Sequence, residues 1–445
     1  MEKTIKDFLN EEYKDFSLYT IEQRAIPSVI DGFKPTARKI VACSISIWKN
    51  GTEKPLKVFQ LVGQVASTMH YHHGNSSAES AVITLAQKFK NNLPLLDEVG
   101  QFGSIRSPDP GAARYIGTKL TKVFNLIYKD NDLVSYKYDE GDKIEPNYYL
   151  PIIPMVLING SSGIAVGFSS NILNRNPSDI TNACLNILND KKFYKIKPFN
   201  NYFSGEYKND PENNKRWIIR GKYTVENTST IKIVELPPSM TYEKYEKVLD
   251  KLVENRHIAS YTDNCKDNID YTIKFNREKL ASLTEDEIFN LLKLEESETE
   301  MFSTLDEYGK LKIFESAEDI IYYFVNFRLN FYIKRKNSLI DKLNHELKII
   351  ANKAKFIKTI IDNKLSINNR KKDDICNDIE KLSLDKIEGS WDYLLRLPIY
   401  SLTKELYDKL KDDFKFKIEE LDKLKKKDPK SMYIEDLEEL KRNLR

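Results

Sequence analysis

The sequence predicts an α+β multidomain protein, and three observations carry this prediction. The first 130 residues alternate short helical patterns with loops and carry an excess of basic side chains. From Asn147 the chain becomes apolar, β-rich and broken by Pro and Gly, which is typical of a mixed α/β domain. Between Gly309 and Gly389 there is no Gly or Pro, which favours a long uninterrupted helix.

Length and charge set the outer limits of the prediction. A chain of 445 residues exceeds one ordinary core and favours two to four structural units. The net charge is only +3, but residues 23–129 hold 14 Lys/Arg against 6 Asp/Glu, a local charge of +8. A basic module on an otherwise near-neutral chain is typical of a phosphate-binding surface.

Cysteine usage and hydropathy indicate the cellular compartment. The four cysteines are scattered without metal-ligand spacing, which favours a reduced, intracellular protein. The first residues contain no apolar signal core, and no stretch approaches the length of a membrane helix. We therefore expect an intracellular protein with no membrane partner.

Three short amphipathic helices are predicted in the basic module. The first covers Pro35–Trp48, the second covers Val58–Met69, and the third follows Asn75 and Ser76, which we expect to cap it. Three short helices with a basic first member favour a helix-turn-helix or winged-helix module.

The rest of the chain divides into a β-rich region and a helical arm. Residues 217–236 predict a hairpin, and the mixed α/β region extends to about residue 305. An apolar stripe predicts a helix over about 317–363, roughly 70 Å long at 1.5 Å per residue, which reads as a coiled-coil arm. A small helical unit follows near residues 392–403, and a charged helix from Lys404 onward is expected to return along the arm.

The Arg114–Tyr115 pair is the first candidate for chemistry. It follows the loop Gly100–Gly111, and we expect it to open a helix. A phenol ordinarily ionises near pH 10, so it needs a nearby cation to stabilise developing negative charge. Arg114 is the obvious cation. Such a pair alone is usually a core tyrosine beside a surface arginine, but the surrounding sequence favours the nucleophile.

Two further segments predict phosphate contacts. In YHHGNSSAES, the residues from Gly74 to Ser77 place N–H groups and hydroxyls at a helix N-terminus, and His72 and His73 add donors. A capped core helix is the alternative, and a zinc site is disfavoured because no Cys or Asp stands at ligand spacing. The other segment, RAIPSVIDGFKPTARKI, gathers four cations around a turn, with solvated surface charge as the alternative. These cations are Arg24, Lys34, Arg38 and Lys39.

Together these segments resemble the breakage-reunion half of type IIA DNA topoisomerases. The matching segments are EQRAIPSVIDGFKPTARK, YHHGNSSAESAVITLAQKF, QFGSIRSPDPGAARYI, YLPIIPMVLINGSSGIAVGFSSNI and DYLLRLPIYSLTKE. They occur in family order and cover nearly the whole chain. The wording YHHG and PIIPMVLING is closer to the eukaryotic enzymes than to bacterial gyrase. A free-standing chain of this size is similar to the medium subunits of T-even bacteriophage topoisomerases.

The resemblance implies a domain order. Residues 1–140 would form a winged-helix DNA-binding and cleavage domain, and residues 141–305 a mixed α/β tower domain. Residues 306–363 and 413–445 would form a long antiparallel coiled-coil arm. Residues 364–412 would form a small helical dimerisation domain at the C-gate.

The resemblance also implies roles for individual residues. Tyr115 would form a 5′-phosphotyrosyl bond, and Arg114, Arg24 and His73 would complete the catalytic set in this chain. The implied DNA-binding residues are Lys34, Arg38, Lys39, Tyr71, Ser77 and Ile164. Ile164 would act as an apolar wedge between base pairs, unless it is an ordinary strand residue. No metal ligand is expected in this chain.

What the sequence lacks points to a partner. It shows no glycine-rich ATPase signature and no Toprim-like acidic cluster. The resemblance therefore implies an ATPase/Toprim partner subunit that binds ATP and Mg²⁺, and a homodimer that acts on double-stranded DNA. It favours ATP-dependent relaxation and decatenation over supercoiling. If the source is viral, the protein would act in the cytoplasm of an infected host cell.

Two other classes remain open. A non-enzymatic DNA-binding coiled-coil structural protein would explain the basic module and the arm, but not the setting of Arg114 and Tyr115. A tyrosine recombinase or type IB enzyme typically places an Arg-His-Arg set near a C-terminal tyrosine, unlike this arrangement.

Overall fold

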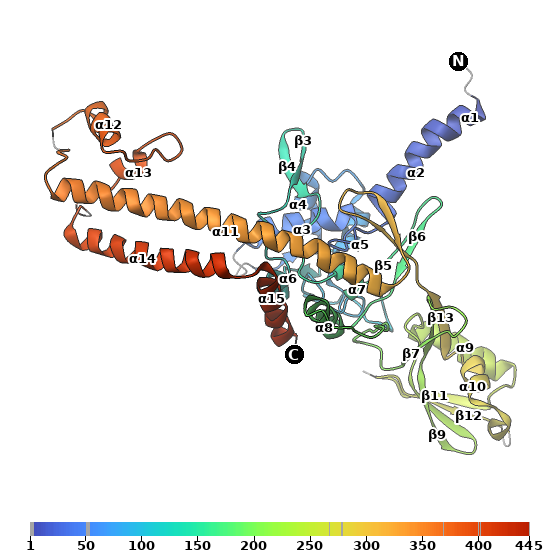
Figure 1. Ribbon diagram of the computed structural model, residues 1–445. Coiled ribbons are helices and arrows are strands. Elements are labelled where there is room, and N and C mark those ends of the chain that lie inside the picture. Colours follow the sequence, from blue (N-terminus) through green and yellow to red (C-terminus); the bar gives the residue numbers. More distant parts are fainter. Residues whose placement is uncertain are drawn as a thin grey trace. The chain divides into compact units, whose positions relative to one another are not determined.

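The computed structural model describes residues 4–49, 54–266, 268–276, 279–367, 369–398, 400 and 402–444. The chain forms two compact units, one of Met1–Arg328 with Ile434–Arg445 and the other of Leu329–Tyr433. The predicted α+β class is confirmed, because both units are helical and the first also carries the sheets (Figure 1). No helix in the described part of the chain is long and apolar enough to cross a membrane.

The first unit begins with a helical module. Its N-terminal elements are α1 (Ile5–Phe8), η1 (Leu9–Tyr13), α2 (Lys14–Thr20) and η2 (Ile21–Ala25). The three predicted helices follow as α3 (Pro35–Ile47), α4 (Val58–Thr68) and α5 (Asn75–Ala86). Their inner faces pack on one another through fully buried aliphatic side chains. Examples are Ile40, Leu61 and Val82.

Two local expectations in this module were wrong. Gly74, not Asn75 or Ser76, is the N-cap of α5, and no side chain caps that helix. No helix opens at Tyr115 either. The chain forms β2 (Gly117–Thr118), which pairs antiparallel with β1 (Leu56–Lys57), and α6 begins only at Lys122 and ends at Ile127. The helical spacing after Tyr115 could not reveal a pairing with residues about 60 positions earlier.

Hairpins and short helices follow α6. The hairpins are β3 (Tyr136–Asp139) with β4 (Asp142–Pro146), and β5 (Ser161–Ile164) with β6 (Ser169–Ile172). The helices are α7 (Met155–Ile158) and α8 (Pro177–Leu188). All residues of α7 are buried, and the turn at Gly32 before α3 lies directly against Met155 and Val156.

The α/β region contains two antiparallel sheets. One sheet has the order β13-β8-β7 and consists of Glu295–Thr299, Arg216–Arg220 and Glu206–Asn209. The other has the order β11-β12-β10-β9 and consists of Ser260–Asp263, Tyr271–Lys274, Thr230–Glu235 and Lys222–Asn227. The predicted hairpin at 217–236 is therefore β9–β10, while β8 belongs to the neighbouring sheet. The helices of this region are α9 (Tyr242–Glu254), η3 (Leu280–Ser282) and α10 (Glu285–Leu291), and a final hairpin joins β14 (Phe302–Leu305) to β15 (Leu311–Phe314).

The second unit is built on a helix pair. Helix α11 runs unbroken over Ala317–Ile361, and α14 over Lys404–Lys426 (Figure 1). The pair is antiparallel, because Glu346 bonds Lys417 while the earlier Lys336 bonds the carbonyl of Lys425. The leucines of both helices pack together between these contacts. The returning segment is not one helix, since α14 ends before Pro429, which opens α15 (Pro429–Asn443).

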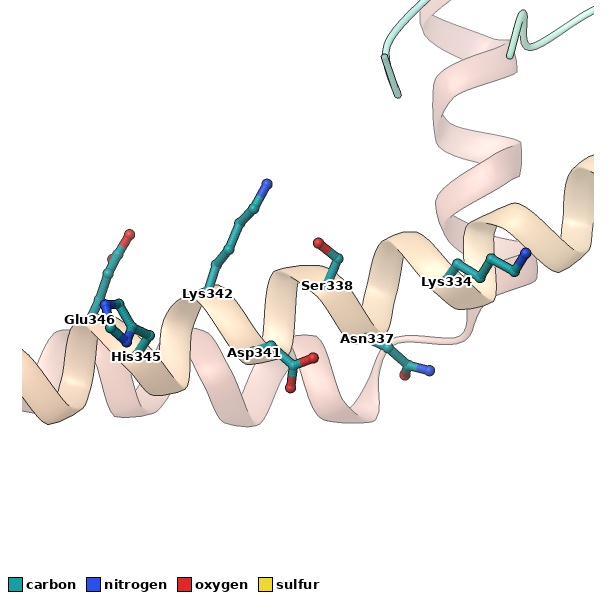
Figure 2. A pocket seen from close by; sticks show the side chains of 7 residues that line it. All are labelled: Lys334, Asn337, Ser338, Asp341, Lys342, His345 and Glu346. Atoms are coloured by element: carbon teal, nitrogen blue, oxygen red, sulfur yellow. The ribbon is translucent and has the colours of Figure 1, made fainter. Parts of the chain in front are cut away.

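The remaining helices of this unit, α12 (Lys372–Lys381) and α13 (Asp392–Leu395), share a small apolar core. A hollow of about 620 Å³ lies along α11 and is lined by side chains of mixed charge, which Figure 2 shows as sticks. The lining side chains are Lys334, Asn337, Ser338, Asp341, Lys342, His345 and Glu346. The domain boundaries implied by the resemblance stay predictions.

Candidate functional site

Tyr115 lies in an exposed turn whose main-chain carbonyls accept hydrogen bonds from neighbouring residues. Its side chain is 68% exposed. Two amides at the start of α4 bond the carbonyls on either side: Val58 donates to Ile116 at 3.1 Å and Phe59 to Ala113 at 3.2 Å. The Lys57 ammonium donates to the carbonyl of Tyr115 at 2.6 Å. The backbone is thus fixed while the phenol stays accessible to a large substrate.

Arg114 supplies a cation next to this phenol. Its guanidinium carbon lies 5.0 Å from the centre of the Tyr115 ring. A positive group at this distance favours negative charge on a phenol oxygen or on a phosphate beside it. The structure therefore brings together the two residues that the sequence predicted to act as a pair.

The glycine-rich loop before this pair is folded back on itself. The Gly111 amide donates to the Gln101 carbonyl at 2.9 Å, and the buried Gln87 side chain donates to the Phe102 carbonyl at 2.7 Å. Gly103 has a φ of +85°, and a Cβ there would lie 2.6 Å from the Pro108 carbonyl oxygen. Only glycine permits so close an approach at this conformation.

Arg24 and His73 are joined through a tyrosine that sequence reasoning missed. The Arg24 guanidinium lies 5.5 Å from the centre of the Tyr19 ring. The Tyr19 hydroxyl lies 3.5 Å from Nε2 of His73. Tyr19 lies in α2 and Arg24 lies five positions later in η2, and this spacing was the only available signal in the sequence. His70 differs from His73, because its ring bonds Asp139 of the β3–β4 hairpin at 3.0 Å.

A groove of about 600 Å³ gathers three of the predicted residues: Arg24, Lys34 and Ser77. The Lys34 ammonium donates to the Ser162 carbonyl at 2.7 Å, and burial lowers the pKa of Lys34. Lys90, which was not predicted, also lines the groove, and burial lowers its pKa as well. The groove therefore presents cations with serine and asparagine side chains, a lining that suits a phosphate backbone.

Other predicted DNA contacts lie in the interior. Arg38 is 5% exposed and bonds the fully buried Asp31 through Nε at 2.8 Å and through a terminal nitrogen at 3.0 Å. Burial opposes the charge of Arg38, but the nearby Asp31 more than compensates, so its pKa is raised. Lys39 bonds Glu145 at 2.8 Å, and Tyr71 is buried with its ring edge-on to His73. Sequence alone could not separate these side chains from Lys34.

Ile164 is 88% exposed at the end of β5, opposite Ser169 of β6. Directly before Ile164, Gly163 packs against the main chain of Ala25, because a Cβ on Gly163 would lie 2.1 Å from the Ala25 carbonyl oxygen. That contact leaves no room for a side chain, so the hairpin lies directly against the segment that carries Arg24. An apolar side chain is therefore held in solvent next to the groove.

The predicted residues thus fall into separate groups. In the described part of the chain, neither Arg114 nor Tyr115 lines the groove that holds Arg24, Lys34 and Ser77. No cluster of three or more His, Cys, Asp or Glu side chains among the described residues is arranged to hold a metal ion.

Comparison with known proteins identifies the family of the chain. Residues 24–438 match the family model for the A subunits of DNA gyrase and topoisomerase IV. The medium subunit of DNA topoisomerase from Enterobacteria phage T4 is 33% identical, and the match covers 99% of both chains. The mitochondrial DNA topoisomerase 2 of Dictyostelium discoideum is 34% identical over 100% of this chain, which spans 35% of that protein.

A solved structure has the same fold. The crystal structure of the DNA-binding, cleavage and re-ligation domain of Plasmodium falciparum topoisomerase II matches with a TM-score of 0.86 and 33% identity. The match covers 98% of this chain and 65% of that one. This chain spans about a third of the length of its eukaryotic relatives. The chain belongs to the type II DNA topoisomerase family, as a member of the cleavage-religation group that includes the A subunits of gyrase and topoisomerase IV.

Proposed function

We propose that this chain cleaves and religates double-stranded DNA through Tyr115, as one subunit of a type IIA topoisomerase. The observation that carries the proposal is the exposed Tyr115 phenol beside the Arg114 guanidinium, on a turn whose main chain is held by Lys57, Val58 and Phe59. An exposed tyrosine on a fixed backbone is suited to attack a bulky phosphodiester.

The reaction is a transesterification. The Tyr115 oxygen attacks a backbone phosphorus, a P–O bond to tyrosine forms, and the bond from phosphorus to the 3′ oxygen breaks. The phenol proton is lost, and the 3′ oxygen leaves as a hydroxyl after taking up a proton. One diester replaces another, so the reverse step reseals the strand without an energy source. Arg114 stabilises the added negative charge.

The other predicted residues are assigned to catalysis or to DNA binding. We assign Arg24 and His73, linked through Tyr19, to the catalytic set near a backbone phosphate. Lys34 and Ser77, which line the groove, would contact the DNA backbone, and the exposed Ile164 would insert between base pairs. Lys39, Arg38 and Tyr71 would support this surface, because their polar groups face the interior.

The family uses Mg²⁺ and ATP in general. Among the described residues, no cluster of carboxylates is arranged to hold Mg²⁺. We propose that a partner ATPase/Toprim subunit binds both, and that two copies of this chain cut opposite strands for ATP-dependent relaxation and decatenation. We further propose that the chain forms a homodimer through residues 364–412. We also propose that it acts inside a cell.

The decisive test is a covalent adduct. The chain is first used to capture an ATPase/Toprim partner by co-purification, the two are combined, and reactions on an end-labelled duplex are stopped with detergent. We expect a 5′-linked protein–DNA adduct with the native chain and none with Tyr115→Phe. DNA affinity should change little, because phosphate contacts elsewhere supply most of it.

The same experiment separates the other classes. An adduct that persists with Tyr115→Phe assigns the nucleophile elsewhere, and a 3′ linkage indicates a recombinase or type IB enzyme. Binding with no adduct in the presence of the partner and Mg²⁺ would leave a non-enzymatic DNA-binding protein.

A further inference from the structure

Arg106 lies at the tip of the loop that leads to Tyr115, and it is 5% exposed. One terminal nitrogen of its guanidinium donates to the carbonyls of Pro237 at 2.7 Å and Met240 at 2.8 Å. The other donates to Glu235 and to the Leu236 carbonyl, each at 2.5 Å. A planar fork with several donors matches this set of acceptors, and the ammonium of a lysine cannot.

The acceptors are themselves fixed. The second oxygen of Glu235 accepts from both the amide and the hydroxyl of Ser204 at 2.9 Å. The amide of Tyr242, in the first turn of α9, donates to the Arg106 carbonyl at 3.1 Å. This amide would otherwise lack an intrahelical partner. Arg106 therefore joins the cleavage loop to the end of β10 and the start of α9.

The loop is fixed at its two ends, which we call its neck (Val99 and Gly117), as well as at its tip. Val99 and Gly117 exchange both main-chain hydrogen bonds, at 3.0 and 2.8 Å, and close the segment between them. Arg106 holds the far end. Arg114 and Tyr115 lie on the limb that returns from the Arg106 tip to the neck. The orientation of this limb depends on both fixed ends.

We propose that Arg106 is a positioning residue for DNA cleavage, which acts by docking the Tyr115 loop onto the β10–α9 corner. This inference rests on the proposed function. Arg106 is buried and its donors face protein carbonyls and Glu235, so it contributes to the orientation of Tyr115 rather than to phosphate binding. Displacements of about 1 Å at a reacting group can lower rates by about a hundredfold, so loss of the anchor should slow cleavage.

The test compares Arg106→Lys with Arg220→Lys in the complex with the partner subunit. Arg220 is a matched control, since it also pairs with two carboxylates of the α/β region, Glu295 at 2.6 Å and Asp286 at 2.7 Å, outside the loop. The measurements are DNA affinity, the single-turnover rate of adduct formation at saturating DNA, the melting temperature, and amide hydrogen exchange at Gly111 and Tyr115.

We expect Arg106→Lys to bind DNA within about twofold of the native chain, to form adduct about tenfold more slowly at saturation, and to exchange faster at both amides. Arg220→Lys should change none of these quantities. If Arg106→Lys does not fold, the double variant Arg106→Gln with Glu235→Gln removes both buried charges together and is measured in the same way.

A native saturated rate in a folded Arg106 variant overturns the inference. Weaker DNA binding with an unchanged saturated rate also overturns it, because Arg106 would then be a DNA contact. Failure of the proposed function is a separate outcome, in which the native chain forms no adduct. In that case faster exchange at Gly111 and Tyr115 would still establish the anchor, and unchanged exchange would refute it.

Discussion

The Lys57 ammonium donates a hydrogen bond of 2.6 Å to the main-chain carbonyl oxygen of Tyr115. Lys57 is the last residue of β1, opposite Gly117 of β2, so the pairing that places the lysine also fixes the chain just after the tyrosine. The nucleophile proposed here is therefore braced by a side chain that is itself exposed. This geometry allows the role of the brace to be measured without disturbing a core.

Lys57→Met should slow covalent adduct formation by about tenfold, which corresponds to about 1.4 kcal/mol, near the value of a hydrogen bond to a charged group. The melting temperature should hardly change, because exposed substitutions usually alter stability by less than about 0.5 kcal/mol. Single-turnover cleavage at saturating DNA and thermal melting test both statements. Lys122→Met, an equal loss of charge on α6, is the control. An equal effect of both substitutions would mean that general charge, not the brace, matters.

Ile164→Ala should reduce DNA bending and cleavage while leaving the fold intact, since its side chain is 88% exposed. A side chain that inserts between base pairs unstacks them, and this cost is offset only by contacts that bent DNA allows. Ile172→Ala, on the partner strand and buried, should instead cost about 2–5 kcal/mol of unfolding free energy. Bending measured by fluorescence transfer, paired with melting curves, distinguishes the two. Normal bending in Ile164→Ala would remove it from the DNA-contact set.

Arg38→Gln should destabilise the fold by about 3–5 kcal/mol, because it leaves the buried Asp31 carboxylate without its cation. Asp31 also accepts from the amides of Phe33 and Tyr149, so the turn before α3 should loosen. Denaturant unfolding measures the loss, and Lys34→Gln serves as the comparison from the same turn. A stable Arg38→Gln variant with weakened DNA binding would favour the direct contact that the resemblance implied.

The contribution of Lys34 to DNA binding should be lost at lower pH than that of an ordinary lysine, because burial lowers its pKa from 10.5. As pH rises through the lowered pKa, the charge disappears and a phosphate contact weakens. Stability changes in the opposite direction: charged Lys34 is disfavoured in the fold, so unfolding free energy rises between the lowered pKa and 10.5.

Salt titrations of DNA binding at pH 7 and at alkaline pH test this expectation. Between pH 7 and alkaline pH, the salt-dependence slope of the native chain should decrease in magnitude. This decrease should exceed that of Lys34→Gln by about one unit. Lys34→Arg, which keeps its charge, should retain the slope at alkaline pH. A Lys34→Gln slope equal to the native slope at pH 7 would show that Lys34 makes no phosphate contact.

The sequence by itself determined the elements that depend on neighbours along the chain. Helices α3, α4 and α11 could be predicted because side chains three and four residues apart share a helical face. The loop 100–111 could be predicted because its Gly and Pro residues cannot continue a helix. The Arg114–Tyr115 pair could be singled out because its context is local, and its role in cleavage stays a prediction. The structure keeps both residues together and leaves Tyr115 exposed.

Only the tertiary structure decided what each side chain faces. Lys34 and Arg38 stand one helical turn apart, yet Lys34 lines a groove and Arg38 is buried on Asp31. The brace of Tyr115 by Lys57 and the anchor of Arg106 on Glu235 join residues 58 and 129 positions apart. Such contacts depend on how distant segments pack, and the periodicity of one segment contains no information about its partner.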